Sequence, residues 1–238
     1  METIACPTIL PPLPAAYTAT RDALHRVAEA VVAPARVAAT GNEIALEVTP
    51  RGFGTPVFPG GGRVRVELDE LLVEAADGSV RRAPLTTLTA AAELAGLPAG
   101  DLDDAPLGVD RDAAGALATF YALAADVLRE LRGEAPECAE PSPIHLWPEH
   151  FDLAFDQGEE ADGRRAGYGF SPGDEQHPEP YVYVGPWAEP PRGPGWTAVG
   201  FRGAELRYAA LRRASDPRAA ALEFLRDRRA ALLGPPGR

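Results

Sequence analysis

The fold class follows mainly from residues 43–84, which read EIALEVTPRGFGTPVFPGGGRVRVELDELLVEAADGSVRRAP. Apolar and polar residues alternate at 44–48 and again at 63–68. A period of two is typical of β-strands with one buried face. The pair Asp77-Gly78, which favours a tight hairpin turn, separates two further strand-like segments. We therefore predict an antiparallel β-meander over residues 43–84.

Three glycines at 60–62 interrupt this stretch. A phosphate-binding loop would need a helix after them, but the next residues, RVRVEL, have the pattern of a strand. Neither Lys nor Ser or Thr stands at the end of the loop. We expect a hairpin turn at this position.

Helical periodicity predicts about four helices outside the meander. Apolar positions recur at helical spacing over residues 20–33, and we expect this first helix to end at Pro34. The others are a short helix over 86–95, a long helix over 112–132 and a final helix that begins at Asp216-Pro217, an N-cap followed by proline at the first helical position.

The second half of the chain is richer in aromatic residues and turns. Strand-like segments occupy residues 150–155, 181–184 and 196–201, and a hairpin-like return strand passes through residues 168–170. Segment 133–143, GEAPECAEPSP, is a linker by composition.

Together these patterns predict an α+β protein. We expect an antiparallel β-meander and an aromatic-rich second β region, packed with about four helices into a single compact module over residues 17–238. The sub-regions 17–132 and 144–238 would be joined by the linker. Residues 1–16 contain several prolines and would form an extended arm.

The net charge of −12 disfavours nucleic acid as a partner, since the basic residues form no stripe along the sequence. All 23 basic residues are Arg, so lysine-based Schiff-base chemistry is excluded.

No basic, apolar leader and no apolar stretch of about 18 residues is evident, so we expect a cytoplasmic protein that does not enter membranes. Cys6 and Cys138 lie in Pro-rich segments, which favours free thiols over a disulfide framework. The alternative is a disulfide between them that fixes the N-terminal arm.

Side chains that can bind a metal or transfer a proton are most closely spaced in HLWPEHFD, residues 145–152. If a strand begins at His150, then His150 and Asp152 share one face. His150, Asp152 and His177 could hold Fe(II) as in non-haem oxygenases, and His145 could join a divalent metal site. Alternatively His150 and Asp152 are a structural pair that bonds to each other or to nearby backbone.

A small-molecule pocket is the second hypothesis for this region. Trp147 and Tyr181 belong to a group of aromatic residues that could line a pocket for an apolar or aromatic ligand, or form a core. Arg51 follows a predicted strand and could hold an anionic group. A third hypothesis is a non-catalytic protein-interaction module that uses the acidic surface and the arm.

The segment Gly169-Phe170-Ser171-Pro172-Gly173 matches the G-x-S-x-G motif of serine hydrolases. The residue after the nucleophile must donate its backbone N–H to the oxyanion, and Pro172 has none. The following residues, GDEQHPEPY, also predict no helix. We therefore reject a hydrolase interpretation of this motif.

Several segments resemble the uncharacterised bacterial domain of unknown function 5996 family. They are TRDALH at 20–25, EVTPRGFGT at 47–55, SPIHLWPEHFDLAF at 142–155, GYGFSPGD at 167–174 and EPYVYVGPW at 179–187. The resemblance covers about residues 17–233 and implies that both sub-regions belong to one module. It implies no activity or cofactor, but it adds His25, Arg51 and Gly52 to the residues worth testing together with His150 and Asp152, and we take His25 and Arg51 as candidates for ligand binding.

The function hypothesis from sequence is therefore a small-molecule-binding or metal-binding pocket, with or without catalysis, centred on His150 and Asp152. The two alternatives are the interaction module and the Fe(II) site.

Overall fold

The structure is a computed structural model that describes residues 9–190, 193 and 195–233. These residues divide into two units. The first comprises Leu13–Ala122 and His145–Phe151, and the second comprises residues 9–12, Leu123–Ile144 and the described residues from Asp152 onward. Two antiparallel sheets and several helices confirm the α+β class. The single module stays a prediction.

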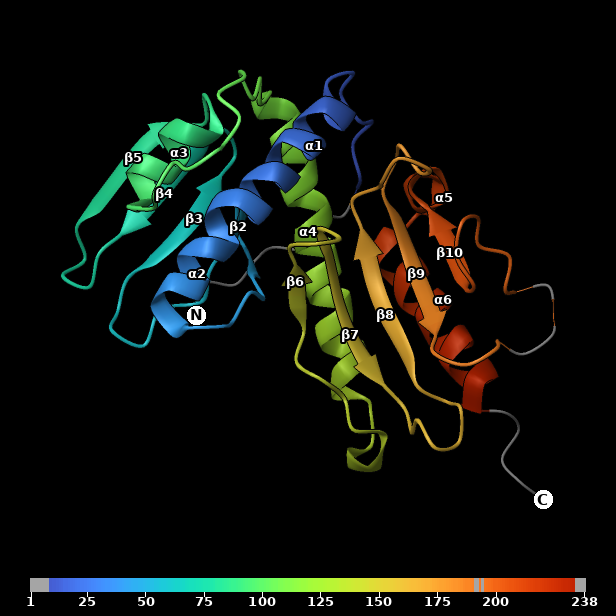
Figure 1. Ribbon diagram of the computed structural model, residues 1–238. Helices are drawn as coiled ribbons and strands as arrows, with labels where there is room; N and C mark the ends of the chain where they lie inside the picture. The colour runs from blue at the N-terminus through green and yellow to red at the C-terminus, as the bar shows by residue number, and fades with distance from the viewer. Residues whose placement is uncertain (1–8, 191–192, 194, 234–238) are drawn as a thin grey trace. The chain divides into compact units, whose positions relative to one another are not determined.

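The predicted meander is confirmed as an antiparallel sheet with the strand order β1-β2-β3-β4-β5 (Figure 1). Gly62 and Gly78 lie in its turns with φ of 78° and 83°, in the left-handed region that glycine enters without strain. The glycines at 60–62 thus form a turn, as expected. The strands are β1 (Glu47–Thr49), β2 (Gly52–Gly54), β3 (Arg63–Glu67), β4 (Glu70–Glu74) and β5 (Val80–Pro84).

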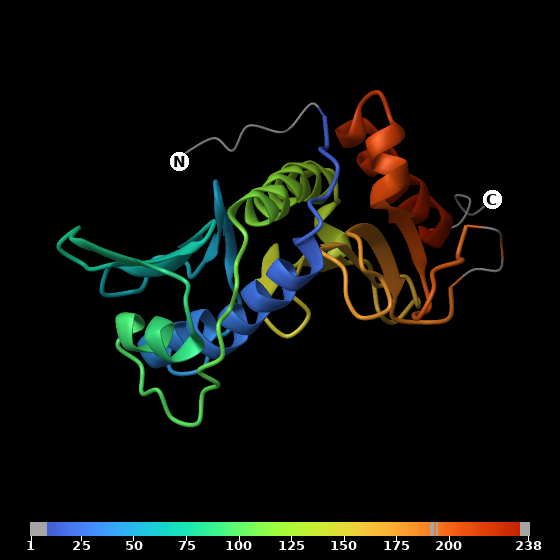
Figure 2. The same cartoon turned by 90° about the horizontal axis from the view of Figure 1, so that it is seen from above.

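Three helical segments of the first unit lie together on one side of this sheet (Figure 2). They are α1 (Tyr17–Val27), which continues through a π-helical turn (Ala28–Val32) into α2 (Ala33–Thr40), and the separate α3 (Leu88–Ala95). Alternate residues of β3, among them Val64 and Val66, are buried. Their burial explains the alternation seen in the sequence.

The expected helix end at Pro34 is wrong, because the helix continues to Thr40. Proline lacks the N–H that would bond to the carbonyl four residues earlier. A π-helical turn directly precedes α2, and its wider winding accommodates the proline without ending the helix. Arg36 is consequently held on a helix and not in a loop.

The predicted long helix is confirmed as α4 (Arg111–Gly133). Its C-terminal half belongs to the second unit, where it pairs with α6 (Pro217–Leu233). Acidic residues on α4 bond to arginines on α6, at Asp126–Arg218, Glu130–Arg218, Glu130–Arg226, Glu134–Arg226 and Glu134–Arg229. Ala219 N donates to Asp216 Oδ1 at 2.9 Å, which confirms the predicted N-cap of α6.

In the second unit, an antiparallel sheet has the strand order β10-β9-β8-β7. In the second unit, α6 contacts β9 and β10 and lies behind the sheet in Figure 1. The apolar face includes Phe170, Val182 and Val184, all fully buried. Its strands are β7 (Asp152–Gln157), β8 (Ala166–Ser171), β9 (Tyr181–Pro186) and β10 (Ala204–Arg207), and the short β6 (His145–Trp147) belongs to the first unit.

A strand over residues 196–201 is a wrong prediction, since the last strand is β10 and residues 196–201 form a loop. Gly200 has φ of 83°, which no strand residue adopts. Phe201 packs its ring against those of Tyr181 and Tyr183, with centroids 6.2 and 6.0 Å apart. The short α5 (Tyr208–Arg213) was also not predicted from the sequence.

Residues 1–8 of the predicted arm, including Cys6, lie outside the described residues. In the part of the arm that is described, Leu10 is buried and the hydroxyl of Tyr208 donates to Pro11 O at 2.8 Å. Cys138 is an exposed thiol in a short 3₁₀ helix (Glu137–Ala139). None of the helices in the described ranges is long and apolar enough to span a membrane.

Candidate functional site

The turn at 148–151, in the centre of the HLWPEHFD block, is held by contacts within the first unit. His25 Nε2 lies 2.7 Å from Pro148 O, and its ring stacks on Phe151 with centroids 5.2 Å apart. Tyr121 donates its hydroxyl to Phe151 O at 2.5 Å. The ring of Phe53 meets Phe151 edge-on at 5.0 Å. His25 therefore positions backbone, and this contact gives no support to its expected role in ligand binding.

Phe151 explains why His150 and Asp152 do not share a strand face as expected. Its φ of 53° breaks the extended backbone, and its side chain is only 1% exposed. His150 lies in an exposed turn, whereas Asp152 begins β7 and is 6% exposed. A shared strand face would require continuous extended backbone from residue 150 onward, and Phe151 interrupts it.

Asp152 belongs to the polar face of the second sheet. In the neighbouring row, the register places Ala154, Gly169 and Tyr183 side by side across β7, β8 and β9. The Tyr183 ring crosses Gly169, and its hydroxyl donates to Asp152 Oδ2. Burial, followed by the charge of Asp152, raises the pKa of Tyr183 well above its usual value of 10.

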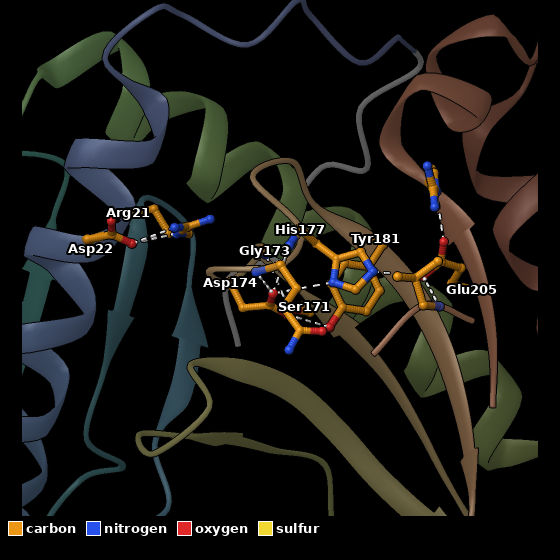
Figure 3. A network of polar contacts seen from close by, with 11 residues as sticks. Arg21, Asp22, Ser171, Gly173, Asp174, His177, Tyr181 and Glu205 are labelled. Carbon is orange, nitrogen blue, oxygen red and sulfur yellow. Dashed lines mark hydrogen bonds and ion pairs between the residues drawn. The ribbon is translucent and has the colours of Figure 1, made fainter. Parts of the chain in front are cut away.

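His177 lies in a polar network of the second unit (Figure 3). Its Nδ1 is 3.3 Å from Asp174 Oδ1 and its Nε2 is 3.0 Å from Glu205 Oε2. Tyr181 donates to Asp174 Oδ2 at 2.9 Å. Both ring nitrogens of His177 thus contact carboxylates, so His177 and Tyr181 connect the loop after β8 to β10. These contacts are structural, and the ligand-binding role of Tyr181 stays a prediction.

Glu205 is the carboxylate of this network that is most withdrawn from water, with 7% of its side chain exposed. Burial alone would raise the pKa of Glu205. Hydrogen bonds from the Arg207 side chain and the Val199 backbone N–H outweigh burial, and its pKa is lowered. Burial would also raise the pKa of Asp174, but the hydrogen bonds that Asp174 accepts outweigh burial, and its pKa is lowered.

We expect acid to destabilise the protein through this network. Because the pKa of Glu205 in the folded state lies below its usual 4.5, its stabilising contribution is complete above pH 4.5. The contribution disappears as pH falls through the lowered value. Urea unfolding between neutral pH and about pH 3 should therefore show a shallower loss of stability for Glu205→Gln than for the unmodified protein.

The matched control for this experiment is Glu189→Gln, because the side chain of Glu189 is 87% exposed. This variant should follow the unmodified protein at every pH. If Glu205→Gln loses stability as steeply as the unmodified protein, the ionised Glu205 does not stabilise the network.

The metal hypotheses gain no support from the arrangement of side chains. Within the described ranges, no group of three or more His, Cys, Asp or Glu residues is placed so that it could hold a metal ion. The metal roles of His150, Asp152, His177 and His145, including the Fe(II) site, stay predictions. Ser171 accepts a hydrogen bond from Gly173 N at 3.2 Å, and no helix follows it, in agreement with the rejection of a hydrolase.

Arg51 lies beside a small hollow of the first unit, whose empty volume out to its open mouth is about 180 Å³. Binding sites for ligands of ordinary size span about 300–1,000 Å³. The hollow is therefore too small for such a ligand, and anion binding by Arg51 stays a prediction. The lining residues are Leu24, Arg51, Gly52, Phe53, Val66, Leu68, Ala114, Leu117 and Ala118.

His145 is brought opposite Glu47 in the first unit. Leu46 and Leu146 exchange two backbone hydrogen bonds, of 2.8 and 2.9 Å, in an antiparallel bridge. Both leucines are buried, so the next residues, Glu47 and His145, project from the other side. Directly opposed side chains of this kind have Cβ atoms about 4.5–5.5 Å apart. The sequence contained no signal for this pairing, which joins residues about a hundred positions apart.

We call the surface formed by Glu47, Thr49, His145 and Trp147 the β1–β6 face. Trp147, a predicted ligand contact, is 37% exposed and meets the ring of His145 edge-on at 5.3 Å. Thr49 is only 4% exposed, and Glu47 and His145 are half-buried between these extremes. The face therefore leads from an exposed aromatic ring to a buried hydroxyl group.

Arg36 on α2 acts on this face. It is 8% exposed, and its Nη2 bonds to Glu43. Burial lowers the pKa of His145, and the charge of Arg36 lowers it further against the opposing effect of Glu43. Burial raises the pKa of Glu47, although Arg63 and Arg36 partly oppose this shift. Arg36 and Glu47 were not identified from sequence, Arg36 because the first helix was expected to end before it.

Comparisons with protein-family models, with curated proteins and with solved structures find no match. The resemblance to the domain of unknown function 5996 family therefore stays a prediction.

Proposed function

We propose that the protein binds a small molecule on the β1–β6 face and transfers a proton to or from it, with His145 and Glu47 as the acid–base pair. The observation that carries this proposal is the Leu46–Leu146 bridge, whose antiparallel register sets His145 across from Glu47. This proposal moves the centre of the site expected from sequence from His150 to His145.

The environments of the two groups suit opposite roles. Because the pKa of His145 is lowered below 6.5, the neutral imidazole that accepts a proton persists to more acidic pH. Because the pKa of Glu47 is raised above 4.5, the carboxyl group that donates a proton persists to less acidic pH. Opposed shifts in neighbouring titratable groups are typical of acid–base pairs. Proton transfer should weaken as pH falls through the lowered pKa of His145, and again as pH rises through the raised pKa of Glu47.

The experiment uses turnover of a metabolite mixture followed by mass spectrometry. We expect the protein to convert at least one compound, and His145→Ala to lower that rate by about 10²–10⁴-fold, the usual contribution of a general acid or base. His150→Ala discriminates between the two possible centres, since His150 lies in an exposed turn. If His150→Ala is inactive and His145→Ala is not, the proposed centre is wrong.

A second check does not depend on the substrate. The ring of His145 should titrate by NMR below the usual value of 6.5. Arg111→Gln is a control, because Arg111 is a 53% exposed partner of Asp69 and should leave this titration unchanged. Conversion of no compound, together with an unshifted His145, would contradict the proposal and favour the non-catalytic interaction module.

A further inference from the structure

Arg36 carries a buried donor without an acceptor. The residue is 8% exposed, and its Nη1 has no hydrogen-bond partner among the residues that the structure describes. Its Nη2 bonds to Glu43, whose side chain is 59% exposed. A buried guanidinium N–H without an acceptor is unfavourable, so this position favours an incoming acceptor atom.

A second buried polar atom without a hydrogen-bond partner lies on β1. Thr49 Oγ1 is buried and has no hydrogen-bond partner within the described ranges. Thr49 follows Glu47 by two residues on β1, so both project on the same side of the strand. A hydroxyl group can donate as well as accept, and it therefore adds a second donor to the β1–β6 face.

The neighbouring charges restrict the kind of anion that fits. Glu43 bonds to Arg36, and the charge of Arg36 also reaches Glu47, so acidic groups flank the guanidinium. A dianion such as phosphate would be repelled by these carboxylates more strongly than a monoanion. A carboxylate also matches the planar guanidinium in geometry and charge. The partly exposed Trp147 offers an apolar surface on the same face.

We propose that Arg36 recognises the carboxylate of a monoanionic ligand whose apolar or aromatic part packs on Trp147. This inference rests on the proposed function, since it names the class of ligand that His145 and Glu47 would act on. Arg36 is then the specificity-determining residue of the site, and His145 and Glu47 are the groups that exchange a proton with the ligand.

Benzoate is the probe, with benzamide as its neutral counterpart and inorganic phosphate as the competing anion. Binding is followed by NMR through the His145 ring and the Trp147 indole. We expect benzoate to bind at least about tenfold more tightly than benzamide, since a charge-assisted hydrogen bond contributes that much or more. Phosphate should bind more weakly than benzoate. Equal affinity for benzoate and benzamide, or tighter binding of phosphate, would overturn the inference.

Two variants test Arg36 directly. Arg36→Lys keeps the charge but loses the planar donor pair, and should weaken benzoate binding by about tenfold or more. Glu43→Gln removes the competing carboxylate and should strengthen benzoate binding severalfold. Glu43 is exposed, so this variant should fold even if Arg36→Lys does not. An unchanged affinity of Glu43→Gln for benzoate would then contradict the inference. Arg111→Gln is the control and should bind as the unmodified protein does.

Failure of this inference can be distinguished from failure of the proposed function. If turnover depends on His145 but both turnover and benzoate binding are unchanged in Arg36→Lys, only the role of Arg36 is wrong. If no turnover depends on His145 while benzoate still binds through Arg36, the face binds carboxylates without proton transfer.

Discussion

Replacing Phe151 with alanine should destabilise the first unit by about 3–5 kcal/mol, the usual cost of truncating a buried phenylalanine. Phe151 is 1% exposed and contacts the rings of His25, Phe53 and Tyr121. Its loss leaves a cavity and removes the packing that holds the left-handed backbone at φ 53°. Urea unfolding of the variant and the unmodified protein measures this difference.

His150→Ala is the matched control for Phe151→Ala, because it changes the adjacent residue in an exposed turn. Its stability should stay within about 0.5 kcal/mol of the unmodified protein. A loss below about 1 kcal/mol for Phe151→Ala would show that the turn is not held by this aromatic packing, since it falls far short of the usual cost.

Replacing Gly169 with alanine should destabilise the second unit by about 1–3 kcal/mol, as overpacking does in a well-filled region. A Cβ at this position would lie 2.5 Å from Cε1 of Tyr183. The ring cannot move away without losing its hydrogen bond to Asp152 and its contact with Phe201. Urea unfolding measures the loss, and combination with Tyr183→Leu should reduce it because the larger ring is absent.

Gly185→Ala provides the control for Gly169→Ala on the neighbouring strand. No atom lies within 4 Å of the position that a Cβ at residue 185 would occupy. This variant should be neutral or gain up to about 1 kcal/mol, because alanine restricts the unfolded chain. Equal losses for both variants would show that glycine is needed for strand conformation and not for the Tyr183 ring.

The long helix and the meander could be predicted from sequence because their side-chain periods lie within short segments. The apolar stripe of α4 repeats with the helical period, and the alternation at 63–68 matches the buried Val64 and Val66 of β3. Burial on one side imposes these periods directly, so the sequence records them. The N-cap of α6 at Asp216 was predicted from the Asp216-Pro217 pair, which is also a local signal.

The candidate site was predicted only in part. His145 and Trp147 were named, but the expected centre at His150 and Asp152 assumed a strand that Phe151 interrupts. A positive φ at phenylalanine is locally unfavourable and cannot be expected from propensity. Packing against Phe53 and Tyr121 offsets that cost in the folded chain.

The α+β class, the meander and the long helix could be derived from the sequence, because each depends on neighbouring residues along the chain. The opposition of His145 and Glu47, and the effect of Arg36 on the pKa of both, arise only in the folded chain. These relations depend on the bridge between Leu46 and Leu146, and on a helix that continues past Pro34. Contacts between residues far apart in the chain follow from how the elements pack, which local periodicity does not contain.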